Sequence, residues 1–315
     1  MRLLGIAILA SVVVTACSSS APSPGSTGGA GGGTTSGARV FASVSAGAYH
    51  SCGVKRDGSI ACWGGGTTNT GKIPEFGQAM PLAGTFSSVS AGSVHTCGVR
   101  TDGGIACWGH TRYGQATPPA ATFASVSTDL FQTCGVTVDG SVTCWGCVPS
   151  SPMDPGAPVE CCTPPAGAFS SVSAGFGFTC GVKRDGTIAC WGPTGSAEST
   201  PPDGTFVSVD VGDSDICGVS TDGSIVCWGA NTDGTMTPPG GAFSSVSVGA
   251  VHACGVRADG TIACWGLNDS GQATPPGGTF ASVSAGAGHT CGVKSDGTIA
   301  CWGDNTYGQA TPPAP

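Results

Sequence analysis

The segment FASVSAGAGHTCGVKSDGTIACWG, residues 280–303, decides the fold, because six earlier stretches of the chain repeat its pattern. Every copy contains Phe-x-Ser-Val, Cys-Gly-Val, Asp-Gly and Cys-Trp-Gly in that order. The copies begin at Phe41, Phe86, Phe123, Phe169, Phe206, Phe243 and Phe280, spaced by 37 residues except for 45 after the first copy and 46 after the third. A unit this short cannot bury its own apolar face, so the seven copies predict a solenoid or a propeller.

Two cysteines lie ten residues apart in every copy and bracket the Asp-Gly turn. In the first copy, a three-residue loop ending at Gly58 places Cys52 opposite Cys62, whereas a two-residue loop would place it opposite Trp63. Glycine suits the left-handed last position of the longer loop. The two cysteines then form a non-hydrogen-bonded pair with Cα atoms about 4.5 Å apart, within reach of a disulfide. We therefore expect seven disulfides, Cys52–Cys62, Cys97–Cys107, Cys134–Cys144, Cys180–Cys190, Cys217–Cys227, Cys254–Cys264 and Cys291–Cys301.

Both faces of each hairpin are apolar. Side-chain alternation puts Cys52 and Val54 on one face and Gly53 and Trp63 on the other. Blades stacked face to face around an axis cover both faces, whereas a sandwich leaves one face polar. The sequence therefore predicts an all-β, seven-bladed β-propeller over residues 40–315, with one disulfide-stapled hairpin per blade. How the ring closes stays open.

The N-terminus resembles a bacterial lipoprotein signal. Arg2 precedes an apolar run at residues 3–14 that is too short to span a membrane and is typical of a signal peptide. Val14-Thr15-Ala16-Cys17 resembles a lipobox, which implies cleavage after residue 16 and acylation of Cys17; the alternative is an ordinary signal peptide with a chance cysteine. Residues 17–39 predict a flexible Gly/Ser/Pro tether. Ser18 resembles an outer-membrane sorting signal, with periplasmic and surface orientations both open.

Composition restricts the function classes. The chain has 55 Gly, 22 Pro and 18 Cys. Its one CxxC, Cys144-Trp-Gly-Cys147, shares a cysteine with an expected hairpin disulfide, and there is no Cys/His cluster, which favours disulfides in an oxidising compartment over zinc. A net charge of −8 lacks the basic footprint of nucleic-acid binding. The sequence shows no nucleophile elbow, paired carboxylates or glycine-rich phosphate loop. We expect no enzyme activity and no cofactor.

Three further cysteines, Cys147, Cys161 and Cys162, lie in the insertion after the third copy. If Cys17 is acylated and fourteen cysteines form the hairpin disulfides, these three cysteines remain, and one of their thiols has no partner among them. Cys147 with either neighbouring cysteine would tie the loop, and the other would be free or paired with a second chain. A redox role is disfavoured, because the CxxC at Cys144-Trp-Gly-Cys147 uses a cysteine of an expected hairpin disulfide and no activating base is adjacent.

The sequences His-Thr-Cys-Gly-Val, Asp-Gly-Thr-Ile-Ala-Cys-Trp-Gly and Asn-x-x-Gly-Gln resemble the regulator-of-chromosome-condensation repeat. The resemblance runs from Phe41 to Pro315, and Gly-Gln-Ala-Thr-Pro-Pro is most similar to the short-repeat bacterial members, which include the type II β-lactamase inhibitors. It implies a seven-bladed propeller used as a binding platform. It implies no single function, since the fold hosts exchange factors, inhibitors and scaffolds.

Strand order places the loop before each Cys-Gly-Val and the loop after each Trp-Gly on one face, here the upper face; the Asp-Gly turns form the lower face. Aromatic residues outside the repeat positions map to the upper face or to the first insertion, in an arc over copies 7, 1, 2, 3 and 4: Tyr49, Phe76, Tyr113, Phe131, Phe176, Phe178 and Tyr307. Exposed aromatics are usual interface anchors. Asp213, Asp215 and Asp304 on the complementary arc would suit a basic partner or a cation. Alternatively, some aromatics pack under the insertions or fill the channel.

Four histidines, His50, His95, His252 and His289, share one repeat position. No Cys or carboxylate completes a metal-ligand set, and the resembled family commonly has His there, so we expect a structural ring bonded to backbone at a strand start. Asp213-Ser214-Asp215 resembles part of a calcium loop, but the later ligands are missing. We expect no metal.

These patterns predict a non-enzymatic outer-membrane lipoprotein of the bacterial cell envelope that binds a protein partner through the upper face. Membrane contact would come from the lipid anchor alone, and nucleic acid is not an expected partner. One alternative is an inhibitor of a secreted or periplasmic enzyme such as a β-lactamase. Another is a carbohydrate-binding or hydrolytic propeller, which would need carboxylates with raised pKa converging in a pocket.

Overall fold

The computed structural model describes residues 40–146, 148–149, 159–160, 163–192, 200–230, 234–235 and 237–314. Cys17 and the three cysteines of the insertion after the third copy lie outside these residues. The described elements are strands, and among them no helix is long and apolar enough to cross a membrane. Two short hairpins occupy the insertions after the first and third copies: β4 (Asn69–Lys72) with β5 (Glu75–Phe76), and β12 (Val148–Pro149) with β13 (Val159–Glu160).

Each copy of the repeat forms one three-stranded antiparallel sheet, with its second strand in the middle. The seven described sheets are β1 (Phe41–Ala46), β2 (His50–Lys55) and β3 (Ile60–Gly64); β6 (Phe86–Ala91), β7 (His95–Arg100) and β8 (Ile105–Gly109); β9 (Phe123–Thr128), β10 (Thr133–Thr137) and β11 (Val142–Trp145); β14 (Phe169–Ala174), β15 (Thr179–Lys183) and β16 (Ile188–Trp191); β17 (Phe206–Val211), β18 (Asp215–Ser220) and β19 (Ile225–Gly229); β20 (Phe243–Val248), β21 (His252–Arg257) and β22 (Ile262–Gly266); and β23 (Phe280–Ala285), β24 (His289–Lys294) and β25 (Ile299–Gly303).

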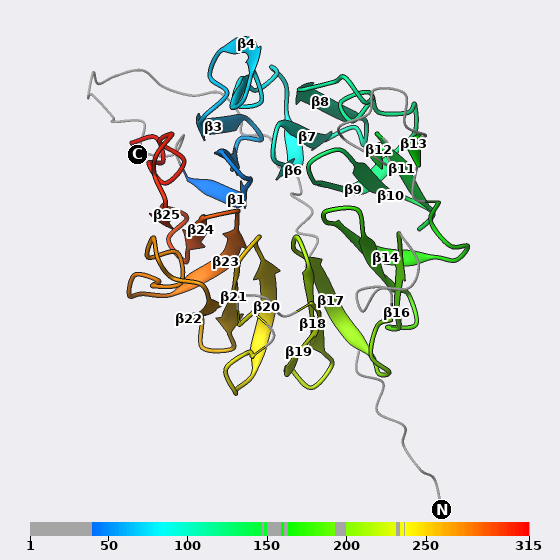
Figure 1. Cartoon of the computed structure of the whole chain (residues 1–315), viewed down its shortest axis with the longest axis vertical. Coiled ribbons are helices and arrows are strands. Elements are labelled where there is room, and N and C mark those ends of the chain that lie inside the picture. The colour runs from blue at the N-terminus through cyan, green and yellow to red at the C-terminus, as the bar shows by residue number, and fades with distance from the viewer. Residues whose placement is uncertain are drawn as a thin grey trace, which may run out of the picture. The chain divides into compact units, whose positions relative to one another are not determined.

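The sheets stand as blades in a ring, and the last blade lies beside the first (Figure 1). Several hydrogen bonds close the ring; among them, Phe41 N–H donates to the Gly297 carbonyl at 2.8 Å, and Ala46 N–H donates to Ser284 Oγ at 3.0 Å. Within the described residues each blade comes from one copy, so the ring closes without strand exchange. The all-β propeller prediction is confirmed.

The hairpin register is as predicted. Cys52 lies opposite Cys62, and the equivalent cysteines oppose each other in all seven blades. All seven expected disulfides are present, with Cα atoms 4.0 to 4.1 Å apart. The Lys55 N–H donates to the Ser59 carbonyl at 2.8 Å, and Gly58 has a φ of 82°. This is the three-residue loop in which glycine avoids the strain of a left-handed backbone.

Blades bury both faces against one another. Cys217 and Val219 of one blade pack with Val246, Val248 and Trp265 of the next. In the first blade, the Phe41 ring lies so close to Gly53 that an added Cβ would be 2.7 Å from Phe41 Cδ1. The glycine of Cys-Gly-Val therefore makes room for the phenylalanine.

An inner ring of hydrogen bonds joins the blades around the axis. The side chain of the next-to-last residue in each first strand accepts a hydrogen bond from a backbone N–H of the next blade, at 2.8 to 3.1 Å: Ser45 from Ala91, Ser90 from Thr128, Ser127 from Ala174, Ser173 from Val211, Asp210 from Val248, Ser247 from Ala285 and Ser284 from Ala46. The backbones approach closely here, because a Cβ on Gly47 would be 2.2 Å from the Gly92 carbonyl oxygen. Glycine, which six of the seven copies have at this position, allows this close approach.

Four buried histidines form a second set of bonds between blades. Nε2 of each ring meets a hydroxyl of the next blade: His50 with Thr96 at 2.6 Å, His95 with Thr133 at 2.8 Å, His252 with Thr290 at 2.7 Å and His289 with Ser51 at 2.7 Å. The Thr96 hydroxyl donates to the Gln78 carbonyl at 2.9 Å, so its oxygen accepts the proton of His50 Nε2. The structural role is confirmed, but the expected backbone partner is wrong.

Burial keeps these rings neutral. It lowers the pKa of His50 and His95 to about 3, and that of His252 and His289 to about 4. Protonation would place a charged imidazolium between the blades, where water cannot solvate it, and this disfavours the protonated form.

The residues at the histidine position match the neighbouring blade even where histidine is absent. Phe178 occupies this position in the fourth blade and packs against a core cluster that includes Ile216 of the fifth blade. Asp215 occupies it in the fifth blade, whose neighbour offers Ala253 in place of a hydroxyl, and the Asp215 carboxylate accepts a hydrogen bond from Thr235 instead. At these two positions the residue that replaces histidine therefore has a packing or hydrogen-bonding partner of its own.

Replacing Thr96 with Val tests the contribution of these bonds. The isosteric change leaves the His50 Nε2 proton buried without its acceptor, which costs about 1 to 3 kcal/mol of unfolding free energy. Guanidinium unfolding with intact disulfides measures the change. The control Thr101→Val removes an exposed hydroxyl bonded to Thr85 and should change stability by less than about 0.5 kcal/mol. Equal effects of the two variants would contradict the account.

Candidate binding face and axial cavity

Two tyrosines meet where the ring closes. Tyr49, between β1 and β2, and Tyr307, after β25, pack edge to face with ring centroids 5.6 Å apart and planes at 89°. Tyr307 is 44% exposed. The predicted proximity of the last and first copies on the upper face therefore holds for this pair.

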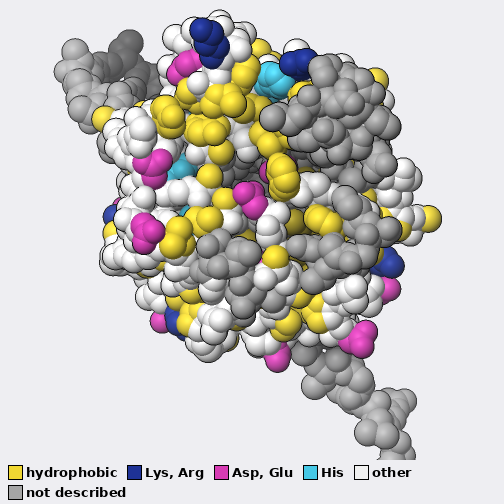
Figure 2. Space-filling view, viewed as in Figure 1, with side chains coloured by type: hydrophobic (Ala, Val, Ile, Leu, Met, Phe, Trp, Pro, Cys, Tyr) yellow, Lys and Arg dark blue, Asp and Glu magenta, His cyan; other side chains and the backbone are white. Residues whose placement is uncertain are grey.

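A second group of aromatic rings extends over the first three blades and is called here the aromatic row: Phe76, His110, Tyr113 and Phe131. Successive ring centroids are 4.6, 5.9 and 5.2 Å apart. The row joins β5 of the first insertion, the loop after β8 and the loop after β9. Figure 2 shows hydrophobic side chains gathered over this part of the ring.

His110 was not among the predicted site residues. It directly follows a Cys-Trp-Gly and shares its loop with Tyr113, which is the signal that could have identified it. Its Nδ1 lies 2.7 Å from Gln115 Nε2, and burial followed by the Arg112 charge lowers its pKa. A neutral His110 ring fits between Phe76 and Tyr113 without the desolvation cost of a buried charge.

The predicted aromatics differ in exposure. Tyr49, Phe76, Tyr113 and Phe131 are half-buried and held by their neighbours, whereas Phe176 is 49% exposed. The first insertion adds the exposed side chains of Ile73 and Met80, at 66% and 51%. An apolar surface built from restrained aromatics matches the composition of protein interfaces.

Two of the predicted partner-binding residues face the interior. Phe178 packs against the core, and Asp215 is only 4% exposed, so the prediction that they contact a partner is wrong. Both occupy the histidine position, where the side chain turns toward the next blade. Asp304 is half-buried and accepts hydrogen bonds from the Thr306 N–H and hydroxyl and from Gln309 Nε2, which hold its pKa below the usual range. Its carboxylate organises its own loop.

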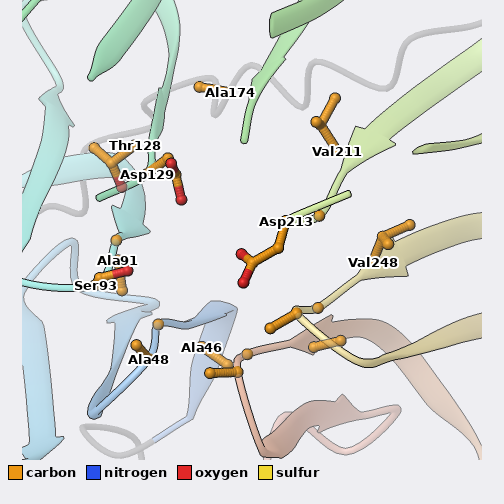
Figure 3. Close-up of a pocket in the computed structure, with 18 residues that line it drawn as sticks. Ala46, Ala48, Ala91, Ser93, Thr128, Asp129, Ala174, Val211, Asp213 and Val248 are labelled. Atoms are coloured by element: carbon orange, nitrogen blue, oxygen red, sulfur yellow. The ribbon is translucent and has the colours of Figure 1, made fainter. Parts of the chain in front are cut away.

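A cavity of about 100 Å³ lies on the axis at the upper ends of the inner strands (Figure 3). All seven blades contribute to it, mostly with Ala, Gly and Val. Two carboxylates, Asp129 and Asp213, point into the cavity (Figure 3). The described residues that line it include no Lys, Arg or His.

Both carboxylates depart from the repeat. Asp129 replaces the tightly packed glycine that the other six copies use, and sequence reasoning missed it although this departure was visible. Asp213 follows the same glycine in the fifth copy, at the position of Ala48, Ala250 and Ala287 in other copies. Among groups of His, Cys, Asp and Glu in the described residues, none of three or more could hold a metal ion.

The cavity disfavours charge on both acids. Burial raises the pKa of Asp129 to about 7, opposed by a hydrogen bond from Leu130 N–H and assisted by the negative charge of Asp213. Burial also raises the pKa of Asp213. Near neutral pH the pair therefore carries less than two full negative charges.

Asp129→Asn should change the pH dependence of stability. The pKa of Asp129 is higher in the folded than in the unfolded chain, so its ionisation costs stability as the pH rises from about 4 through about 7. The stability of Asp129→Asn relative to wild type should therefore increase over this window and level off above it. Denaturant unfolding at a series of pH values measures this difference, with exposed Asp203→Asn as a control that should stay flat. A pH-independent difference for Asp129→Asn would contradict the assignment.

The pattern of the regulator of chromosome condensation (RCC1) repeat matches residues 41–69, 86–115, 169–192, 243–272 and 280–309. No curated protein sequence matches the chain.

Solved structures share the fold. The CRINKLY WD40 ectodomain of the Arabidopsis thaliana receptor kinase ACR4 is 23% identical with a TM-score of 0.66, over 84% of this chain and 96% of that chain. Prp20p of Saccharomyces cerevisiae is 14% identical with a TM-score of 0.64, over 87% and 85%. The same yeast protein bound to Kap60 is 14% identical with a TM-score of 0.61, over 73% and 72%. At these identities the likeness shows the fold alone. Five of the seven copies therefore match the regulator of chromosome condensation repeat, and the chain shares the β-propeller fold of these structures.

Proposed function

We propose that the protein is a non-enzymatic lipoprotein of the bacterial cell envelope that binds a protein partner through its upper face. The observation that carries the proposal is the aromatic row, which together with the Tyr49–Tyr307 pair spans blades 7, 1, 2 and 3. Half-buried aromatics present large apolar area at a small cost in conformational entropy, and such residues dominate binding energy at protein interfaces.

The similar folds are compatible with a binding platform. Yeast Prp20 has been solved in complex with Kap60, and its binding to Gsp1p and histones is described with its structure. Those partners belong to that protein. They support the general use of a propeller surface for protein recognition, while the site itself must be argued from this chain's own residues.

The envelope location rests on two features. The lipobox-like residues 14–17 lie outside the described part of the chain and remain a sequence-based prediction. Seven disulfides within hairpins would persist in an oxidising compartment and would be rare in a reducing cytosol. These features support our proposal that Cys17 attaches the propeller to the outer membrane; nucleic acid is not part of the proposal.

The axial carboxylates bear on the hydrolytic alternative, because their pKa values are raised and they share a cavity. The cavity of about 100 Å³ is small. Sites for small-molecule substrates usually occupy about 300 to 1,000 Å³. The small volume of the cavity favours binding over hydrolysis of a sugar.

Alanine substitution of the upper aromatics should weaken partner binding. Tyr49→Ala, Tyr113→Ala and Phe131→Ala should each cost about 1 to 3 kcal/mol, roughly 5- to 150-fold in Kd, with little effect on folding. Because Tyr113 and Phe131 contact each other, their double variant should lose less than the sum. Affinity capture from envelope extracts with the full-length protein isolates the partner, and titration with the purified partner gives the Kd.

Lower-face substitutions provide the control. Lys55→Ala, Lys183→Ala and Lys294→Ala lie at the lower ends of β2, β15 and β24, and binding should be nearly unchanged. If these variants weaken binding while the aromatic variants bind normally, the upper face is not the binding face.

The anchor is tested separately. Cys17→Ser removes the only thiol that the lipobox could present for acylation, so the precursor should stay uncleaved and should lose detergent-phase partitioning. Immunoblotting of fractionated cells after detergent phase separation gives the measurement. Normal maturation and partitioning of this variant would refute the lipoprotein assignment.

A further inference from the structure

We propose that the axial cavity receives a Lys or Arg side chain of the protein partner that docks on the upper face. This inference rests on the proposed function and adds the chemistry of the partner. It rests on two aspartates, Asp129 and Asp213, which replace the usual residues of the repeat and point into one small cavity.

The repeat itself gives no structural reason for two aspartates to lie in this cavity. Six copies have glycine at the position of Asp129, where the backbone of the next blade leaves almost no space; a Cβ on Gly249, for example, would be 2.1 Å from the Gly286 carbonyl oxygen. Asp213 comes from another blade and another repeat position. Both carboxylates nevertheless point into the same cavity (Figure 3).

The cavity fits one side chain. Its volume of about 100 Å³ is far below that of a metabolite site, and its wall is otherwise mostly Ala, Gly and Val. Asp213 is exposed, and Asp129 is half-buried. An aliphatic stem can contact the apolar wall while its terminal cation reaches the carboxylates, as Lys and Arg side chains commonly do.

Other nearby titratable groups do not supply the positive charge. Asp210 ends β17 beside the cavity, and its carboxylate accepts hydrogen bonds from the Ser173 hydroxyl and the Val248 N–H. His252 and His289 lie behind the cavity wall and bond to hydroxyls of the next blade. Burial lowers the pKa of both histidines to about 4, which leaves them neutral. A cation from outside is therefore the complementary occupant.

The cavity is continuous with the proposed interface. Asp129 is two residues before Phe131 of the aromatic row, and Leu130 lies between them. Phe176, 49% exposed, occupies in the fourth blade the repeat position that Asp213 occupies in the fifth. A partner that covers the aromatic row therefore lies beside the cavity and can extend a side chain into it.

The test uses full-length protein and two small probes, N-acetyl-lysine methylamide and its neutral analogue N-acetyl-norleucine methylamide. Carboxyl resonances of ¹³C-labelled Asp129 and Asp213 are followed during titration. The lysine probe should shift both resonances in a saturable way, and the norleucine probe should not.

Asp129→Gly/Asp213→Ala is the matched variant, because both substitutions restore residues that other copies already use and so preserve the packing. Binding of the lysine probe, measured by calorimetry, should weaken about tenfold or more in this variant, since both charges are removed. Asp203→Asn, an exposed substitution outside the cavity, should bind like the wild type.

Equal responses to the two probes, no response to either, or wild-type affinity in the double variant would overturn the inference. Binding of the purified partner separates this inference from the proposed function. If the aromatic variants weaken partner binding and Asp129→Gly/Asp213→Ala does not, the binding face stands and the cation receptor fails. If neither set weakens partner binding, both fail.

Discussion

The hydrogen bond from the backbone N–H of one blade to the side chain of its neighbour is the contact on which the remaining structure depends. It recurs at all seven boundaries around the axis, supplied six times by serine and once by Asp210. A short hydrogen bond this close to the axis requires the ends of neighbouring strands to approach within van der Waals contact. Six of the seven copies therefore have a glycine directly after the first strand. Three-stranded blades can then close into a ring with a cavity for little more than one side chain.

The outer parts of the blades are joined by matched pairs. Histidine meets a hydroxyl at four boundaries, while Phe178 meets an apolar cluster and Asp215 turns to Thr235. Phe178 replaces the polar ring with apolar packing, and the buried carboxylate of Asp215 keeps a hydrogen bond, as buried positions favour. These positions are occupied by packing, whereas the loop aromatics and the axial carboxylates face away from the neighbouring blade and are the residues that we propose for recognition.

Much of the fold could be predicted from the sequence, since the ten-residue cysteine spacing and the turn glycine determine the hairpin register within one copy. The arc of upper-face aromatics was also predictable where the residues lie inside loops, as with Tyr49, Tyr113 and Phe131. Phe178 and Asp215 were misplaced because strand alternation within a hairpin does not tell which way the side chain at the start of the second strand turns. That direction depends on the neighbouring blade. Asp129 was missed because its significance appears only when the glycine at that position is seen to pack against a carbonyl.

The central claim is that the upper face binds the partner. Hydrogen–deuterium exchange of the full-length protein with and without its partner tests it most directly, because protection can be followed in every blade at once. The account predicts slower exchange on binding in the loops at residues 47–49, 110–115, 129–132 and 304–309, with no change in the Asp-Gly turns. Protection confined to the Asp-Gly turns, with unchanged exchange in the upper loops, would contradict it.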